Sequence, residues 1–137
     1  MSLIVQPVSL MHIHQTWPLV EPIFIKGGKE ATDEYSLDQI KTYLTSGIWM
    51  LAVAVDEENK IHGVSTINFY NTPNHCIGFI TTTAGKAIVN PKVYAQLCDL
   101  LKSKGATRVR CAARESVARL YRRVGMKERY TIMETIL

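Results

Sequence analysis

The sequence predicts a mixed α+β domain, an α/β sandwich in which helices cover both faces of one central sheet. Three observations support this prediction. Segments with helical and with strand periodicity interleave along the chain. Three consecutive strand-like segments between residues 48 and 83 are separated by short polar turns, which is typical of an antiparallel meander. After the meander, strands and helices alternate as β-α-β-α-β, and this order requires crossover connections.

The first part of the chain contains a strand and two helices. Leu3–Val8 is predicted to be a strand. The segment Ser9–Lys26 has helical character but contains Pro18 and Pro22, so its helix is expected to be kinked or to begin late. Ser36 followed by Gln39 has the spacing of a capping box, and a second helix should follow it and end at Gly47.

The meander comprises the strands Ile48–Asp56, Ile61–Tyr70 and His75–Thr83. Pro91 then suits the first turn of a helix, because that position needs no backbone N–H. Apolar spacing and terminating glycines predict the remaining elements. These are a helix ending at Lys104-Gly105, a strand Thr107–Ala112, a helix Arg114–Val124 and a final strand Arg129–Leu137.

Length and composition favour a single domain spanning residues 1–137. The chain is 47% hydrophobic and 20% charged, which is typical of a globular protein and not of a disordered one. The apolar run Ile48–Val55 is too short to cross a membrane, and Met1–Pro7 lacks a secretory pattern, so we expect a cytoplasmic protein. Three cysteines without a Cys-x-x-Cys pair indicate reduced, buried thiols. His12 and His14 lack a third ligand, so no metal site is predicted.

Positive charge is concentrated in one part of the chain. Residues 102–129 carry ten Lys or Arg side chains and two Glu, a net charge of +8, whereas the whole chain carries +4. Such a segment suits an anionic partner, for example a phosphate-bearing cofactor, a nucleic acid or an acidic protein face. A solvated surface that keeps the protein soluble is the alternative. Nucleic acid is the less favoured partner, because no recognised binding motif accompanies the charge.

The segment Arg114–Met126 reads Arg-Glu-Ser-Val-Ala-Arg-Leu-Tyr-Arg-Arg-Val-Gly-Met. It resembles the last-helix motif of the GNAT (GCN5-related N-acetyltransferase) superfamily, typically Asn-x-x-Ala-x-x-Leu-Tyr-x-x-x-Gly-Phe. Leu120, Tyr121 and Gly125 match that motif, and Arg114 stands where the family usually has asparagine. The order of elements resembles the same fold over nearly the whole chain.

This resemblance implies that acetyl-CoA binds where the fourth and fifth strands splay apart, between His75–Thr83 and Thr107–Ala112. The pyrophosphate would lie at the start of the next helix, where free N–H groups and a partial positive charge favour anions. The usual glycine-rich pyrophosphate loop is absent from Ala84–Tyr94, and Pro91 removes one N–H donor. Lysine charge and threonine hydroxyls could compensate, and arginines of the last helix suit the 3′-phosphate. The expected cofactor-binding residues are Thr81, Thr82, Thr83, Lys86, Lys92, Arg114, Arg119 and Arg122.

Tyr121 is the expected catalytic residue, because the matching tyrosine of many family members protonates the departing CoA thiolate. A phenol is neutral at pH 7 and can donate that proton. Packing of the ring against the sheet is the alternative role. No general base stands out among the candidates. These are Glu30, Asp33, Glu34, His62 and His75.

Two functions from different classes remain open. The first is an acetyl-CoA-dependent N-acyltransferase that acts by direct transfer on an unidentified amine of a small molecule or a protein. The second is a catalytically inactive structural or interaction protein. In size and in its altered phosphate loop the chain resembles small GNAT-like proteins encoded by short-tailed phages, which would place it in the host cytoplasm or the virion. Only about one strand fits after Gly125, where the family commonly has two, so we expect an open sheet edge and a homodimer.

Overall fold

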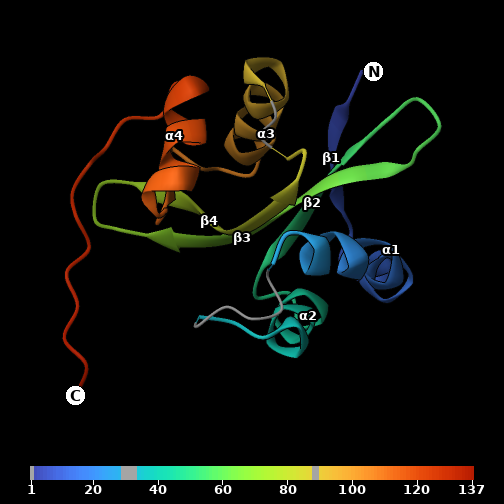
Figure 1. Ribbon diagram of the computed structural model, residues 1–137, viewed down its shortest axis with the longest axis horizontal. Helices are drawn as coiled ribbons and strands as arrows, with labels where there is room; N and C mark the ends of the chain where they lie inside the picture. Colours follow the sequence, from blue (N-terminus) through green and yellow to red (C-terminus); the bar gives the residue numbers. More distant parts are fainter. Residues whose placement is uncertain (1, 29–33, 88–89) are drawn as a thin grey trace.

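The computed structural model describes residues 2–28, 34–87 and 90–137, and the strands of these residues form one five-stranded sheet (Figure 1). In spatial order the strands are β1 (Ile4–Val8), β2 (Met50–Val55), β3 (Ile61–Asn71), β4 (Cys76–Gly85) and β5 (Arg108–Cys111). The first four pair antiparallel with their neighbours, and β5 pairs parallel with β4. The predicted meander and the crossover after it are therefore confirmed.

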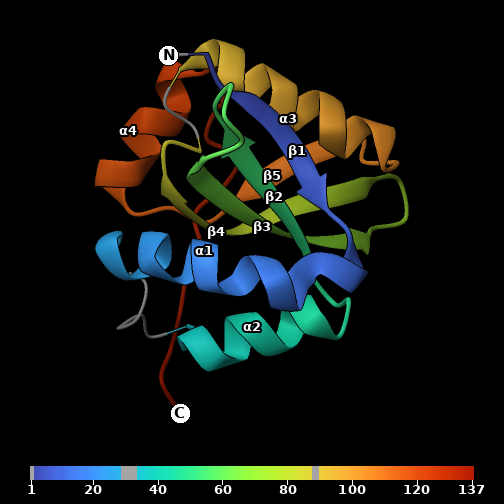
Figure 2. The same cartoon turned by 90° about the vertical axis from the view of Figure 1, so that its right-hand side faces the viewer.

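Helices cover both faces of the sheet, as predicted (Figure 2). One layer holds α1 (Ile13–Lys26) and α2 (Leu37–Thr45), and the other holds α3 (Pro91–Ser103) and α4 (Glu115–Arg123). Each layer buries its own apolar cluster against the sheet. The first cluster is built around Phe24, Ile40 and Leu44, and the second around Leu97, Leu101 and Tyr121.

Helix α1 begins late, after a turn of 3-10 helix (Leu10–His12), and both of its prolines lie inside it. The capping box before α2 is present. The Ser36 hydroxyl accepts a hydrogen bond from the Gln39 N–H at 3.2 Å, and the Ser36 N–H donates to the Gln39 side chain at 2.9 Å. A local sequence signal thus determines where α2 begins, whereas α1 begins at Ile13 without a side-chain cap and before both of its prolines.

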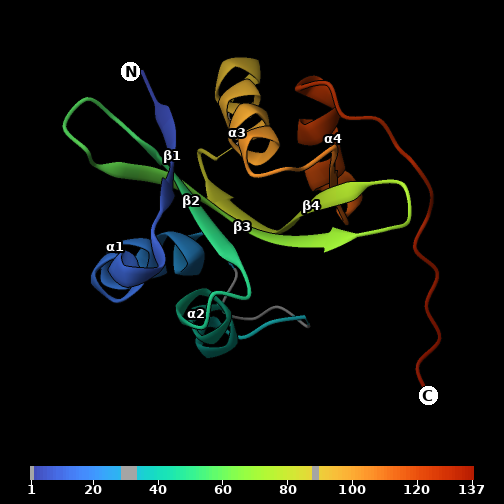
Figure 3. The ribbon, with the colours of Figure 1, turned by 180° about the vertical axis from the view of Figure 1, so that it is seen from behind.

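The predicted final strand, Arg129–Leu137, is wrong: residues 126–137 have no regular secondary structure. Residues 127–137, called here the exposed tail, leave α4 and run outside the helices and the sheet (Figures 1 and 3). Alternating apolar residues give the segment strand propensity. A strand also needs a neighbouring strand to satisfy its backbone groups, and none of the described strands pairs with the tail.

Two further expectations concern cysteines and membranes. Cys76, Cys98 and Cys111 are free, as expected, but each is half-buried instead of fully buried. Among the described residues no helix is both long and apolar enough to span a membrane.

Candidate functional site

Strand β4 is longer than its parallel partner, and this difference exposes part of its edge. Only Ile77–Ile80 of β4 pair with β5, opposite Arg108–Cys111. Beyond Ile80, β4 continues to Gly85 with a neighbour on the β3 side alone. We call residues 81–85 the unpaired β4 edge. It lies where the sequence resemblance predicts that the two strands splay apart.

A β-bulge lies at the start of this edge. Thr66 of β3 is opposite Thr82 and Ile67 is opposite Ile80, so Thr81 is an extra residue in β4. The Thr66 hydroxyl shares hydrogen bonds of 2.6 Å with the hydroxyls of both Thr81 and Thr82. The Thr81 hydroxyl also donates to the Thr66 carbonyl at 3.0 Å. These hydroxyls are therefore used within the sheet, and any contact of this edge with a ligand falls to the backbone and to Thr83.

Backbone groups of Thr83 and Gly85 face away from β3. The Lys86 N–H donates to the His62 carbonyl at 2.9 Å. This bond shows which residues after the bulge point their backbone N–H and C=O groups toward β3. Because backbone groups alternate along a strand, those of Thr83 and Gly85 point toward the side where β5 has already ended. An extended ligand could therefore pair with them as a strand would.

Tyr121 of α4 is buried beside this edge. Its side chain is 4% exposed, and its hydroxyl lies near Thr83 and Cys111 without making a hydrogen bond of normal geometry to either. Burial raises the pKa of the Tyr121 phenol, and the nearby Cys111 thiol raises it further, while an interaction with Thr83 opposes the shift. The phenol thus stays protonated at neutral pH and can donate a hydrogen bond there, while the same shift makes it a weaker acid than a free phenol. Since buried polar groups almost always have partners, this orphan hydroxyl suggests a ligand or water.

Two cysteines lie near the phenols of Tyr94 and Tyr121. Burial raises the pKa of the Cys98 thiol, next to Tyr94, and of the Cys111 thiol, next to Tyr121. Both thiols are therefore protonated at neutral pH, and a thiolate is needed for nucleophilic attack. Neither thiol is therefore activated as a nucleophile.

The N-terminus of α3, the expected pyrophosphate site, offers few free donors. The Asn90 side chain accepts a hydrogen bond from the Val93 N–H at 2.9 Å, and Pro91 has no N–H. Lys86 and Lys92 are exposed on either side of this helix start. Positive charge near the helix would therefore come mainly from lysine side chains.

The predicted arginines of α4 differ in their surroundings. Arg114 is the N-cap residue of α4 and makes no side-chain capping bond, and Arg119 is exposed. Arg122 forms ion pairs with Glu115 and Glu128 on the surface. Arg114 and Arg119 are thus better placed than Arg122 to bind a phosphate, because Arg122 would first have to break its two ion pairs.

Among the described candidates for a general base, His62 has its backbone beside the end of the unpaired β4 edge, but its side chain is engaged by Asp56. His62 donates to Asp56 at 2.7 Å, and this bond, with backbone N–H donors of Lys60 and Glu58, lowers the pKa of Asp56. His75 lies just before the first residue of β4, whereas the unpaired β4 edge is at the other end of that strand. Burial and the nearby arginines lower the pKa of His75. Glu34 is exposed. The candidates Glu30 and Asp33 lie outside the described residues.

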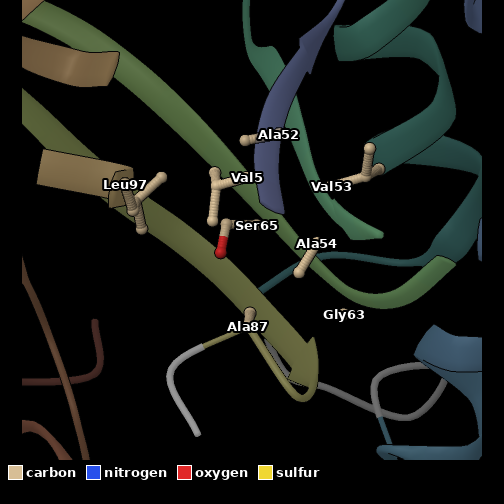
Figure 4. A pocket seen from close by; sticks show the side chains of 8 residues that line it. All are labelled: Val5, Ala52, Val53, Ala54, Gly63, Ser65, Ala87 and Leu97. Atoms are coloured by element: carbon tan, nitrogen blue, oxygen red, sulfur yellow. The ribbon is translucent and has the colours of Figure 1, made fainter. Parts of the chain in front are cut away.

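A small pocket lies between the sheet and α3, beside Gly63 and Ser65, the β3 partners of Gly85 and Thr83 (Figure 4). Its volume is about 10 Å³, and its walls come mainly from β1, β2, β3 and α3. Ser65 contributes the only side-chain oxygen drawn among its lining residues (Figure 4). The pocket is smaller than a typical ligand site and has no titratable side chain, so we assign it no function.

Sequence reasoning missed two residues of the site, Thr66 and Cys111. Thr66 holds the bulge, and only the register of β3 with β4 brings it opposite the run Thr81–Thr83. Cys111 lies at the end of β5 next to Tyr121, and its place depends on where the parallel pairing stops. Within the part of the chain that the structure describes, no three His, Cys, Asp or Glu side chains gather as metal ligands would.

Comparison with known proteins links this architecture to acetyltransferases. No protein-family model and no curated protein matches the sequence significantly. Solved structures do match over nearly the whole chain. A GNAT family acetyltransferase of Staphylococcus aureus is 14% identical with a TM-score of 0.68, covering 100% of both chains.

Two further solved structures give the same picture. An aminoglycoside acetyltransferase from an uncultured soil metagenomic sample, solved in complex with trehalose, is 15% identical to this chain with a TM-score of 0.71. The match includes 98% of this chain and 96% of that protein. A predicted acetyltransferase of Clostridium acetobutylicum with acetyl-CoA is 14% identical with a TM-score of 0.65, with the same coverage. At 14–15% sequence identity, these matches show that the chain shares the fold of these proteins and nothing further.

Proposed function

The chain has the GNAT fold, and from this premise we propose that it is an acetyl-CoA-dependent N-acetyltransferase acting on an unidentified amine. One observation carries the proposal. The Tyr121 hydroxyl is buried and unpartnered beside the unpaired β4 edge. A structural tyrosine at this position would be expected to use its hydroxyl, whereas a proton donor needs it free.

The residues present suit acetyl-CoA in three respects. The backbone of Thr83 and Gly85 offers an amide ladder for the pantetheine arm. Exposed Lys86 and Lys92 offer charge for the pyrophosphate, although the helix start between them is largely capped by Asn90. Arg114 and Arg119 are the proposed partners of the 3′-phosphate. Bound there, acetyl-CoA supplies the acetyl thioester.

In the proposed reaction the amine nitrogen bonds to the acetyl carbon, the carbon–sulfur bond breaks, and the amine loses a proton. Tyr121 holds a proton at its Oη for the departing thiolate. Its raised pKa keeps that proton in place throughout the neutral range. No described histidine or acid is positioned to take the proton that the attacking amine loses, so we propose that the amine enters as the free base and releases this proton to solvent water after the attack. Tyr121 would then regain from solvent the proton that it gives to the thiolate.

Binding of acetyl-CoA is the direct test. At about 100 times its dissociation constant, a ligand stabilises the folded state by roughly 2.7 kcal/mol, which a thermal melt detects. We expect Lys92→Ala to weaken the shift, and Lys60→Ala, an exposed lysine of the β2–β3 turn, to leave it unchanged. Release of free CoA in the presence of a panel of primary amines would then identify the acceptor class.

A second function is favoured by one specific observation. Asn90 and Pro91 occupy or remove the helix donors that a pyrophosphate would use. A protein that kept the fold as a structural or interaction module, for example in a phage particle, would have no need of those donors. Absence of any thermal shift at millimolar acetyl-CoA would contradict the enzyme and favour this second function.

A further inference from the structure

One end of the sheet has a face that no described helix covers. At the hairpin between β3 and β4 the sheet reaches beyond α1 and α2, which lie on the same side further along the strands (Figures 1 and 3). The buried residues that β3 and β4 contribute to the apolar cluster of α1 and α2 are Val64 and Ala84. Both lie far from the hairpin, at the other end of their strands.

Two rows of directly opposite residues cross β3, β4 and β5 near this hairpin. The rows are Tyr70, Ile77, Arg108 and Asn68, Phe79, Arg110. Residues that lie directly opposite each other in neighbouring strands put their side chains on the same face of a sheet. The alternate residues Phe69 and Val109 belong to the cluster of α3 and α4, so the two rows lie on the other side. We call these two rows the open face.

The open face carries an aromatic surface. The ring centres of Tyr70 and Phe79 lie 6.3 Å apart. Tyr70 is partly exposed and Phe79 is half-buried, whereas Ile77 beside them is fully buried. Exposed rings stack with the bases of single-stranded nucleic acids largely regardless of sequence, because every base has a π face.

Acidic side chains do not neutralise the positive charge of this face. Strands β3, β4 and β5 contain no Asp or Glu, and neither Arg108 nor Arg110 forms an ion pair with a residue that the structure describes. Arg110 donates instead to the neutral Tyr130 hydroxyl at 3.1 Å. Burial lowers the pKa of His75, and the positive charges of Arg108, Arg110 and Arg129 lower it further, so these cations gather at one end of the sheet.

Single-stranded nucleic acid accounts for both the charge and the rings. An acidic protein would match the charge but would not need aromatic side chains beside it, whereas a single strand presents both phosphates and unpaired bases. We propose that the open face binds single-stranded nucleic acid, with phosphates on Arg108 and Arg110 and a base stacked on Tyr70. No local motif marks this face in the sequence, because its residues come from three strands. This inference does not depend on the proposed enzymatic function.

Fluorescence anisotropy of a fluorescein-labelled oligothymidylate, titrated with the full chain at low salt, tests the proposal. We expect binding whose affinity falls as the salt concentration rises. Tyr70→Ala should weaken this binding about 5- to 150-fold, the usual loss for one base stack. Tyr70→Phe keeps the ring and should bind like the parent protein. Circular dichroism verifies that both variants are folded.

The charge is tested separately by Arg108→Gln, a change at an exposed side chain. It should lower the affinity and reduce the slope of log affinity against log salt by about 0.7. Lys102→Gln is the matched control, because it removes the same charge from α3, in the layer on the opposite face, and should have a smaller effect.

Four outcomes would each overturn the proposal. They are no binding at low salt, equal affinity of Tyr70→Ala and the parent protein, equal effects of Arg108→Gln and Lys102→Gln, and displacement of the oligonucleotide by polyglutamate at equal charge concentration. The last outcome would indicate an acidic protein as the partner of this face.

Discussion

At the scale of single residues, Tyr121 combines two properties that rarely occur together. Its ring packs in the cluster of α3 and α4, while its hydroxyl has no hydrogen-bond partner. A buried hydroxyl without a partner costs folding free energy, on the order of 1–3 kcal/mol. The sequence left two roles open for this tyrosine, core packing and proton donation. The geometry is compatible with both, since the ring packs and the hydroxyl stays free.

The substitution Tyr121→Phe should therefore move stability and activity in opposite directions. Phenylalanine keeps the packed ring and removes the unsatisfied hydroxyl, so urea denaturation should show unchanged or increased unfolding free energy. Under the proposed function, kcat should fall about 10²–10⁴-fold, the usual contribution of a general acid, with affinity for acetyl-CoA unchanged.

The control for this variant is Tyr70→Phe, which removes a partly exposed hydroxyl at the far end of β3 and should alter neither quantity. Equal turnover of Tyr121→Phe and the parent protein would remove Tyr121 from the mechanism. A clear loss of stability would show that the hydroxyl has a partner.

At the scale of elements, the turn that leaves β4 is pressed closely against β3. A Cβ added at Gly63 would lie 2.4 Å from the backbone nitrogen of Ala87. Gly85 has a φ of +66°, in the left-handed region that favours glycine. Both glycines position the segment that leads from the unpaired β4 edge toward α3.

We predict that Gly63→Ala displaces this turn and lowers stability by about 1–3 kcal/mol, because backbone atoms cannot yield as a side chain can. Gly78→Ala is the matched control in the neighbouring strand. There the new Cβ would lie 3.3 Å from the flexible end of Leu101, so the cost should be smaller. Urea denaturation of the two variants measures the difference, and equal costs would contradict the close backbone approach.

The elements differ in how far sequence determines them. The capping box at Ser36, the proline at the start of α3 and the glycine that follows α4 are local signals, and each predicted its helix end. The bulge at Thr81 depends on pairing with Thr66, fifteen residues away, and no local pattern encodes it. The segment 129–137 has strand propensity, but whether it forms a strand depends on a neighbour.

The candidate site could be predicted only in part, for the same reason. Tyr121 and the region of Thr81–Thr83 were identified from a motif and from strand order. The engagement of two threonine hydroxyls with Thr66, and of Arg122 with two glutamates, depends on contacts between elements. These contacts occupy side chains that the sequence alone suggests are free to bind a ligand.

At the scale of the whole molecule, the sheet separates two apolar clusters. Ile40 is fully buried in the cluster of α1 and α2, and Ile67 is fully buried in that of α3 and α4. Residues on opposite faces of a sheet have few common neighbours. Their contributions to stability should therefore be nearly independent.

We predict that Ile40→Val and Ile67→Val each cost about 0.5–1.5 kcal/mol and that the double variant costs their sum within about 0.5 kcal/mol. Ile67→Val combined with Ile80→Val is the comparison, because these residues are direct partners across β3 and β4 on one face. That pair should depart from additivity by about 0.5 kcal/mol or more. Equal coupling in both pairs would contradict the separation into two clusters.

Because of the bulge, even-numbered residues of β4 contribute to the apolar clusters on both faces of the sheet. Before the bulge, Ile80 faces α3 and α4, and after it, the likewise even-numbered Ala84 faces α1 and α2. If the same residues continued the regular alternation of a strand with no bulge, Ala84 would face the layer of Tyr121 and Thr83 would face the opposite layer. Deletion of Thr81 would join Ile80 directly to Thr82 in a regular ladder and leave Thr83 and Ala84 on their present faces, whereas insertion of one further residue after the bulge would exchange those faces.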